Sequence, residues 1–548
     1  MSANKGFFRN AAVMFIAMFI SKGLGAVLKI PLGNILGGEG MGYFTTAYSI
    51  FTPVLSFACA GIPTILTRTV AGYTAGGKYG RIRTARRCSL LLALILGVAG
   101  AAVIYITAVP FVCYIANSPD SLPGVLLIAP ATLFCSVTAV YRGYYEGLSD
   151  TLPTALSQVI ESFVKALLGV GLSWFVYANG VRFFGSQSAA LPYAAAAAIL
   201  GVTVSEFCGM VFMLCRSRRK SDSYDAYGGK LSGSELFSLC RELFMRSLPI
   251  SLGAAASNLL SLADMLTVSN CINLSADIFG SYWADNTLLS KISQDCSDVG
   301  NFMYGCYAGI IMSVYMLAAA ASGIVARCAL PRLTYAAECG SGAEHEIKLL
   351  IKGTSVISAP ITLFMAVLAE PILRLLYPSR LTEAEVSALP LALLSAGGTA
   401  AALLGSVCVI FHAYGDFGSP IRITLICGAL KLLLNIVFIP VPMLNISGAA
   451  VSSVLSNAVC LIYAVKSVRK RFGISTGCIR YTLPSLFAAV SGAVGTYLFF
   501  RGLEAGAGIP ASMLISVILG GIMYALILFI CDSEDCAAVI RLLRRRNA

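Results

Sequence analysis

The stretch Tyr141–Lys165, YRGYYEGLSDTLPTALSQVIESFVK, joins two long apolar segments through a short polar loop. Asp150 is placed to cap the outgoing helix, and Pro153 suits its first turn, where a missing N–H costs nothing. Glu161 and Lys165 then stand four positions apart, on one face of a segment that is expected to lie in lipid. The stretch therefore predicts helices that carry charges inside a membrane.

The same arrangement recurs late in the chain. The segment Phe411–Lys431, FHAYGDFGSPIRITLICGALK, again places a loop with Asp, Gly and Pro before an apolar helix that carries a lysine. Asp416 precedes Lys431 by 15 positions, and Asp150 precedes Lys165 by the same interval. A loop and helix used twice predict a protein that is built from two related halves.

The composition predicts an all-α polytopic membrane protein. Of the 548 residues, 57% are hydrophobic and 12% are charged, and the mean hydropathy is +0.82. Soluble proteins carry about 25% charged residues. The apolar runs are long and unbroken, which suits spanning helices of about 20 residues and does not suit the short alternating strands of a membrane barrel.

We predict about fourteen membrane spans from these runs. The spans are expected near residues 7–34, 43–71, 88–116, 122–146, 152–178, 189–215, 244–270, 300–329, 350–377, 386–412, 420–441, 446–466, 480–500 and 509–531. Loops on one side hold 30 of the 39 Lys and Arg, and loops on the other side hold five. Because cytoplasmic loops are the basic ones, both termini are expected in the cytoplasm, with the spans in the plasma membrane. The net charge of +13 thus reflects topology, and no nucleic-acid partner is expected.

The spans divide the chain into related parts. A six-helix bundle is expected at 1–215 and a second one at 244–466, joined by a cytoplasmic linker at 216–243 that is rich in Ser, Gly and Lys. Residues 467–548 are expected to add two transmembrane helices and a basic cytoplasmic tail. Because six is an even number, both bundles would have the same orientation in the membrane.

No pattern of catalytic residues is present. The chain has two histidines, and it contains neither a nucleophile elbow nor a Walker A or Rossmann fingerprint. Its 18 cysteines are scattered without a CxxC pair, and most lie in apolar segments, so they are interpreted as helix-packing residues. We therefore expect no enzymatic activity, no cofactor and no metal site.

Cations in or beside the predicted spans are the first candidates for a binding site, because charges in lipid are costly. They are Lys22 and Lys29 in the first span, Lys165 in the fifth, Lys431 in the eleventh, and Arg68 and Arg142 at inner span ends. Snorkelling to the interface is the alternative for Lys29, and Arg68 either sets the topology or gates an inside opening. Phosphate is the anion that clustered Lys and Arg hold most readily, so the set suits an anionic substrate.

Three acidic residues within the predicted spans are further candidates. Glu161 is either the structural partner of Lys165 or a part of the binding site. Glu206 in the sixth span and Asp264 in the seventh are candidates for ion coupling. Each of these two either pairs with a lysine of another helix or accepts a proton or a cation.

Several short motifs resemble those of a known group of transporters. They are Ser21–Gly25 (SKGLG), Gly37–Phe44 (GGEGMGYF), Gly61–Pro63 (GIP), Tyr141–Glu161, the seventh span around Asp264, Glu370–Tyr377 (EPILRLLY) and Asn445–Ala450 (NISGAA). In this order and over essentially the whole chain, they resemble the multidrug/oligosaccharidyl-lipid/polysaccharide (MOP) exporter superfamily. The resemblance is closest to its polysaccharide-flippase branch, with the stage V sporulation protein B-like proteins and the lipid II flippases.

This resemblance implies a fold of two six-helix bundles in a V around a central cavity, worked by alternating access. It also implies that the two C-terminal helices, expected at 480–531, form a groove for a lipid tail. Lys22 and Lys29 match positions that are usually arginine in that branch, and Lys165 matches a basic residue of its sporulation members. One departure is that Asn301–Gly305, at the start of the eighth span, lacks the arginine of the lipid II flippases.

The first hypothesis is a flippase that moves a polyprenyl-diphosphate-linked oligosaccharide or peptidoglycan precursor from the inner to the outer leaflet. Its partners would be that lipid-linked sugar diphosphate, membrane lipids and a coupling ion, either a proton or sodium. A cation-coupled multidrug exporter of the same superfamily is the alternative, and it would need bundle acids and few cavity lysines. A non-transporting membrane scaffold in envelope assembly is a third possibility.

Overall fold

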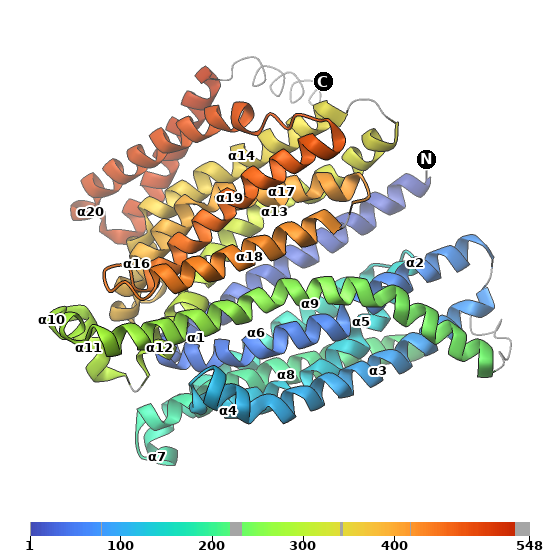
Figure 1. The fold of residues 1–548 in the computed structure, drawn as a ribbon, viewed down its shortest axis with the longest axis horizontal. Coiled ribbons are helices and arrows are strands. Elements are labelled where there is room, and N and C mark those ends of the chain that lie inside the picture. The colour runs from blue at the N-terminus through green and yellow to red at the C-terminus, as the bar shows by residue number, and fades with distance from the viewer. Residues whose placement is uncertain are drawn as a thin grey trace. The chain divides into compact units, whose positions relative to one another are not determined.

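A computed structural model of the chain describes residues 2–77, 79–219, 233–296, 298–339, 343–416 and 418–531, and within these ranges every regular element is a helix (Figure 1). Helices are the expected result for a long apolar chain, because lipid offers no partner for free N–H and C=O groups. The all-α class predicted from the composition is therefore confirmed. The linker predicted at 216–243 and the tail lie partly outside the described residues.

Eleven helical stretches of the described residues are long and apolar enough to cross a membrane, or up to twelve if the bent pair α16 and α17 forms one span. One of these stretches, Gly23–Thr74, covers the predicted span 43–71 and the second part of the span predicted at 7–34. Helix α1 (Ser2–Cys59) continues through a kink at Gly37, where φ is 65° and ψ is −166°, and no loop separates the two parts. The count of fourteen spans stays a prediction.

The contacts within the chain define two compact units, each described here by itself. The first unit comprises Met1–Asn273 and Leu289–Ile310, and the second comprises Leu274–Leu288 and Ile311–Ala548. The division predicted in the linker at 216–243 stays a prediction, because contact density alone does not identify a repeated half.

The first unit consists of long helices together with several short ones. They are α1, α2 (Gly61–Ala75), α3 (Tyr79–Pro110), α4 (Leu122–Ile128), α5 (Ala131–Gly147), α6 (Leu152–Ala178), α7 (Gly180–Phe184), α8 (Gln187–Arg219), α9 (Gly233–Ile278), α11 (Thr287–Asp295) and α12 (Val299–Tyr304). Helices α6 and α8 pack so closely that a Cβ at Gly201 would lie 2.4 Å from the nitrogen of Gly169. Glycines permit such an approach of helix backbones inside a membrane.

The kinked part of α1 packs against a π-helix, Gly305–Ile311, that follows α12. A Cβ on Gly305 would lie 1.9 Å from the carbonyl oxygen of Gly38, so only glycine fits there. The Asn301 amide also donates a hydrogen bond to the Glu39 carbonyl over 3.0 Å. Main-chain contact and this bond together hold the start of the predicted eighth span against α1.

The second unit is also helical. Its helices are α10 (Gly280–Asp285), α13 (Met312–Cys339), α14 (Ala343–Val367), α15 (Ala369–Leu376), α16 (Leu381–Ala396), α17 (Gly398–Ala413), α18 (Gly418–Phe438), α19 (Ile446–Phe472) and α20 (Cys478–Cys531). Its core is formed by apolar residues of α13, α14, α17 and α19, with Leu333, Ile351 and Phe411 fully buried. Burial of large apolar side chains of this kind stabilises each by about 1.5–3 kcal/mol.

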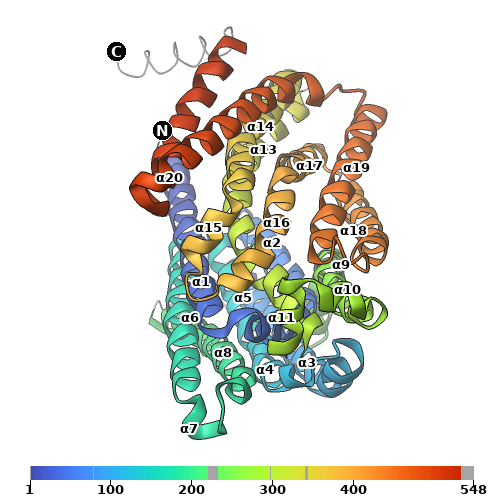
Figure 2. The ribbon, with the colours of Figure 1, turned by 90° about the vertical axis from the view of Figure 1, so that its left-hand side faces the viewer.

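Helix α20 bends back at Gly508, where φ is 74°, so its two limbs lie side by side (Figure 2). The limbs touch through small residues: a Cβ on Gly520 would lie 1.8 Å from the Thr496 hydroxyl oxygen. The Tyr524 hydroxyl donates to the Val356 carbonyl of α14 over 2.8 Å. The two limbs thus form a hairpin that is anchored on α14.

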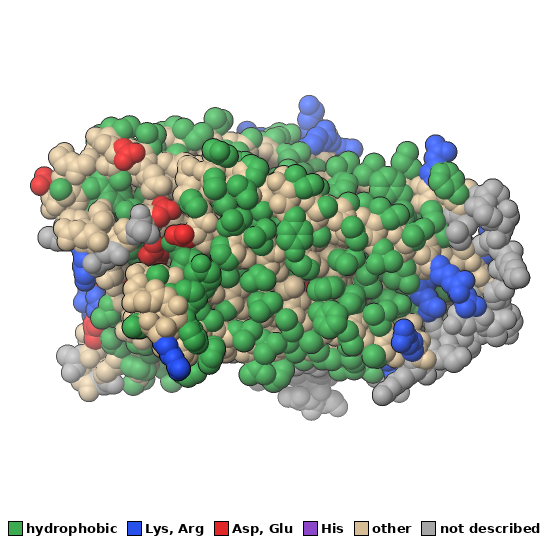
Figure 3. Space-filling model, turned by 90° about the horizontal axis from the view of Figure 1, so that it is seen from below, with side chains coloured by type: hydrophobic (Ala, Val, Ile, Leu, Met, Phe, Trp, Pro, Cys, Tyr) green, Lys and Arg blue, Asp and Glu red, His purple; other side chains and the backbone are tan. Residues whose placement is uncertain are grey.

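The charged side chains on the face in Figure 3 are separated along its length. A band of hydrophobic side chains lies between one end that shows acidic residues together with some Lys and Arg, and another end that shows Lys and Arg. Such a band is what lipid contact requires.

The two repeated loops start their helices differently. At α6 the residue before the helix is Thr151, which makes no side-chain cap hydrogen bond, and Pro153 lies in the first turn as predicted, while the cap by Asp150 stays a prediction. At α18 the Asp416 carboxylate accepts a hydrogen bond from the N–H of Ser419 over 3.1 Å. Both loops have four residues, and each aspartate stands two residues before its helix begins. The residue three positions after Asp150 is Pro153, which has no N–H to donate, whereas the residue three positions after Asp416 is Ser419.

Candidate functional site

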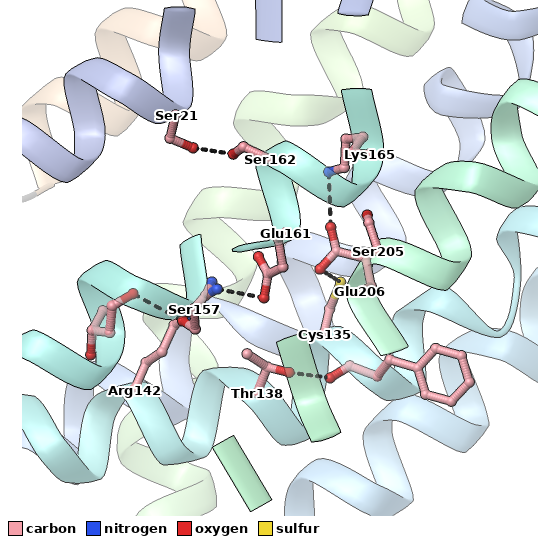
Figure 4. A network of polar contacts seen from close by, with 12 residues as sticks. Ser21, Cys135, Thr138, Arg142, Ser157, Glu161, Ser162, Lys165, Ser205 and Glu206 are labelled. Carbon is pink, nitrogen blue, oxygen red and sulfur yellow. Dashed lines mark hydrogen bonds and ion pairs between the residues drawn. The ribbon is translucent and has the colours of Figure 1, made fainter. Parts of the chain in front are cut away.

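The charged residues that the sequence analysis singled out on α5, α6 and α8 come together in the first unit (Figure 4). Arg142 lies near the end of α5, Glu161 and Lys165 lie one turn apart on α6, and Glu206 lies on α8. Because α6 packs against α8 through glycines, side chains between them are buried and need partners. The result is two ion pairs that each join two helices.

The first ion pair joins Arg142 to Glu161. The Arg142 Nη2 atom lies 2.6 Å from Glu161 Oε1, and its Nε–H donates to the Ser157 hydroxyl over 3.0 Å. The alternative in which Glu161 is the structural partner of Lys165 is therefore wrong. Each of these two residues has a closer partner on a neighbouring helix, which a spacing of four along α6 cannot reveal.

The Glu161 carboxylate lies in a slot on α8 that exists because residue 209 is glycine. A Cβ on Gly209 would lie 2.0 Å from Glu161 Oε1. The Glu161 side chain is only 9% exposed. The carboxylate is therefore held between the Arg142 guanidinium and the backbone of α8.

The second ion pair joins Lys165 to Glu206. The Lys165 Nζ atom lies 2.9 Å from Glu206 Oε1, and the Cys135 thiol donates to Glu206 Oε2 over 3.1 Å. The alternative in which Glu206 pairs with a lysine of another helix is thus confirmed. Tyr48 of α1 lies within electrostatic range of both Lys165 and Glu206. Four helices of the first unit therefore surround this pair.

The four charges sum to zero, but the cations are the more accessible partners. The side chains of Arg142 and Lys165 are 22% and 25% exposed, whereas those of Glu161 and Glu206 are 9% and 13% exposed. Removing one partner of a buried pair costs roughly 3–5 kcal/mol, because the other charge is left uncompensated. The accessible surface of the cluster is thus cationic, which suits an anion.

The structure places the remaining predicted residues elsewhere. Lys22 lies on α1, and its side chain is outside the described part of the chain. Lys29 also lies on α1 and is partly buried. Arg68 is exposed on α2, Asp264 lies on α9, and Lys431 lies on α18 of the second unit. None of them is a member of the two ion pairs.

Helix α1 nevertheless passes close to the cluster. The hydroxyl of Ser21, the neighbour of Lys22, is hydrogen-bonded to the hydroxyl of Ser162, the neighbour of Glu161 (Figure 4). A Cβ on Gly169 of α6 would also lie 2.8 Å from the Leu28 side chain, next to Lys29. Both predicted lysines of α1 are therefore on turns that contact α6.

Sequence reasoning missed two residues of the site. Cys135 was interpreted as a packing residue, but its thiol is a hydrogen-bond donor to Glu206. It stands seven positions before Arg142, two turns away on the same face of α5, and this spacing is the signal that could have identified it. Gly209 carried no signal, because its role depends on a side chain of another helix.

The second copy of the repeated unit lacks the corresponding acid. Cys427 follows Asp416 by 11 positions, as Glu161 follows Asp150. The Cys427 thiol faces α19 and donates to the Asn457 side-chain oxygen over 3.6 Å. The two repeated stretches of sequence therefore differ chemically 11 positions after their aspartate, with an ion-paired acid on α6 and a thiol on α18.

Two protein-family models match the chain. The model described as "Polysaccharide biosynthesis protein" matches residues 7–334, and the model described as "Lipid II flippase MurJ" matches residues 307–520. Among curated proteins of Bacillus subtilis (strain 168), the chain is 25% identical to the lipid II flippase MurJ over 37% of this chain and 38% of that protein. It is 22% identical to stage V sporulation protein B over 40% of each chain. The alignments thus span about two fifths of these relatives.

Solved structures share the fold over nearly the whole chain. A lipid II flippase MurJ in an inward closed conformation matches with a TM-score of 0.64 and 13% identity, covering 95% of this chain and 99% of that one. An inward-facing multidrug resistance MATE family transporter of the MOP superfamily matches with a TM-score of 0.61 and 15% identity, covering 84% and 98%. At these identities the likeness concerns the fold.

Proposed function

Since this chain belongs to the family of polysaccharide biosynthesis proteins, in the polysaccharide-flippase branch of the MOP superfamily, we propose that it is a flippase for a lipid-linked sugar diphosphate. It carries a polyprenyl-diphosphate-linked oligosaccharide or peptidoglycan precursor from the inner to the outer leaflet of the plasma membrane. This is transport and not an enzymatic reaction, since no bond of the cargo changes.

The observation that carries the proposal is the accessible cationic side of the two ion pairs. Arg142 and Lys165 lie on adjacent helices of the bundle and are the exposed members of their pairs. A diphosphate offers oxygens that a guanidinium and an ammonium group both bind. Lys22 and Lys29, on the turns of α1 that contact α6, are proposed to complete the site.

The proposed path keeps the two ends of the cargo in different surroundings. The sugar and the diphosphate cross through the bundles, while the prenyl tail stays in lipid beside the α20 hairpin, whose outer face exposes large apolar residues such as Leu483, Leu498 and Leu526. We propose fourteen spans, two six-helix bundles and cytoplasmic termini, with alternating access between two states. Glu206 and Asp264 are the proposed sites of coupling to a proton or sodium.

Flipping by the purified protein tests this proposal. The protein is reconstituted in proteoliposomes with a fluorescent polyprenyl-diphosphate sugar, and the fraction that becomes accessible on the other leaflet is measured over time. Wild-type protein is expected to flip the lipid, and Lys165→Ala is expected to slow it at least ten-fold, since about 1.4 kcal/mol of phosphate binding is lost. Lys291→Ala, which removes an exposed lysine of α11, is the matched control and is expected to be as active as wild type.

Absence of flipping by folded wild-type protein would contradict the proposal. The multidrug-exporter alternative would then be tested by drug efflux from cells that express the wild type or the Asp264→Asn variant. Equal flipping by Lys165→Ala and wild type would leave a flippase without the proposed diphosphate site.

A further inference from the structure

The two ion pairs of the cluster differ in how firmly the structure holds them. Arg142 bonds both Glu161 and Ser157, and Ser157 in turn donates to the Thr154 carbonyl over 2.9 Å. Glu161 is held in the Gly209 slot, where α8 leaves it no space to move. This pair is a fixed anchor between α5, α6 and α8.

The second pair has no such support on its cation. The Lys165 ammonium group makes one described hydrogen bond, to Glu206, and it stands at the end of a flexible four-carbon stem. It lies among Tyr48, Cys135 and Glu206 of three other helices, yet a quarter of its side-chain surface is accessible. Lys165 can therefore turn from Glu206 toward a ligand, whereas Arg142 keeps its bond to Glu161.

From this asymmetry we infer that Glu206 is an internal competitor for the cargo: its carboxylate occupies Lys165 in the empty protein, and the diphosphate displaces it. The inference rests on the proposed function and adds to it a residue that regulates the same site. Glu206 is a positioning residue here, because it acts through Lys165 and does not touch the cargo.

Glu206 keeps other partners when Lys165 leaves it. The Cys135 thiol bonds the second carboxylate oxygen, and the Arg142 guanidinium lies within electrostatic range. Glu161, Tyr48 and Cys59 are the other titratable groups that face it. After the displacement, the Glu206 carboxylate therefore still accepts a hydrogen bond and still lies near a cation, which reduces the cost of leaving it in the bundle.

Competition of this kind has two effects of opposite sign. It weakens binding of the cargo, since the fraction of Lys165 that is available is small, and the apparent dissociation constant rises in proportion. It also neutralises Lys165 in the protein without cargo. The protein can therefore change back to its inward-facing state without an unpaired charge in the bundle. A protein without the competitor should therefore bind more tightly and return more slowly.

The test measures binding of farnesyl diphosphate to the full chain in nanodiscs. Glu206→Gln is expected to bind about ten-fold more tightly than wild type, corresponding to about 1.4 kcal/mol for a partly buried pair. Glu242→Gln is the matched control: it removes one carboxylate from an exposed ion pair with Arg246, away from the cluster, and it is expected to bind as wild type does. Glu206→Asp, with a shorter side chain and a weaker grip on Lys165, is expected to bind with intermediate affinity.

A second readout separates this role from a structural one. In proteoliposomes Glu206→Gln is expected to slow net flipping several-fold and to leave exchange of labelled for unlabelled lipid unchanged, because exchange needs no empty return. Binding by folded Glu206→Gln and Glu206→Asp that equals or falls below that of wild type would overturn the inference alone. Absence of farnesyl diphosphate binding by wild type and by both variants would overturn the proposed diphosphate site as well.

Discussion

Replacing Gly209 with alanine is predicted to disturb the Arg142–Glu161 anchor without removing any charge. The new Cβ would lie 2.0 Å from Glu161 Oε1, whereas real Cβ atoms essentially never approach another atom within 3.0 Å. Either the carboxylate moves by at least the difference, 1.0 Å, or α6 and α8 separate. Overpacking of this kind costs roughly 1–3 kcal/mol, and loss of the 2.6 Å ion pair would add to it.

Thermal unfolding in detergent, followed by tryptophan fluorescence or by thiol labelling of buried cysteines, measures this effect. Gly209→Ala is expected to lower the melting temperature by several degrees and to reduce flipping, because the anchor no longer positions α5 against α6. Gly171→Ala is the matched control, since a Cβ there meets no atom within 4 Å and alanine favours a helix by about 0.5–1 kcal/mol.

A compensating change makes the prediction sharper. Glu161→Asp shortens the acid by one methylene, so the double variant Gly209→Ala with Glu161→Asp is expected to recover part of the lost stability. Equal melting temperatures of Gly209→Ala and Gly171→Ala would refute the reasoning, because the slot on α8 would then not exist in the folded protein.

Three further outcomes follow from the contacts. Arg142→Ala leaves Glu161 uncompensated and should lower the free energy of unfolding by roughly 3–5 kcal/mol. The double variant Arg142→Ala with Glu161→Gln should lose less, and thermal unfolding measures both. Tyr524→Phe removes one hydrogen bond to α14 and should cost about 1 kcal/mol. Burial raises the pKa of Asp416, but hydrogen bonds from the first turn of α18 and the Arg471 guanidinium outweigh this and hold the pKa below its usual range. Its stabilising contribution is therefore complete above about pH 4 and is lost as the pH falls through the native pKa, so Asp416→Asn should show a smaller acid-side drop in melting temperature.

The sequence identified the members of the site better than their pairing. Arg142, Glu161, Lys165 and Glu206 were all singled out, because a charge inside an apolar run is visible without knowledge of the fold. One alternative paired Glu161 with Lys165 within α6, from a spacing of four, but Glu161 pairs with Arg142 of α5. The alternative in which Glu206 pairs with a lysine of another helix is confirmed. A helical spacing reports only neighbours on one helix, whereas α5 and α8 bring partners that are 19 and 41 positions away.

Hydropathy and motif order by themselves determined that the chain is an all-α membrane protein of the MOP superfamily, and the family-model matches confirm this. Hydropathy is a sum over residues that are neighbours in the sequence, so it can be evaluated without knowledge of the fold. Only the tertiary structure decided that α1 continues through Gly37, that Cys135 binds Glu206, and that Gly209 makes room for Glu161. These features depend on which atoms of distant segments meet, and close packing makes that outcome sensitive to ångström-scale distances that no local pattern records.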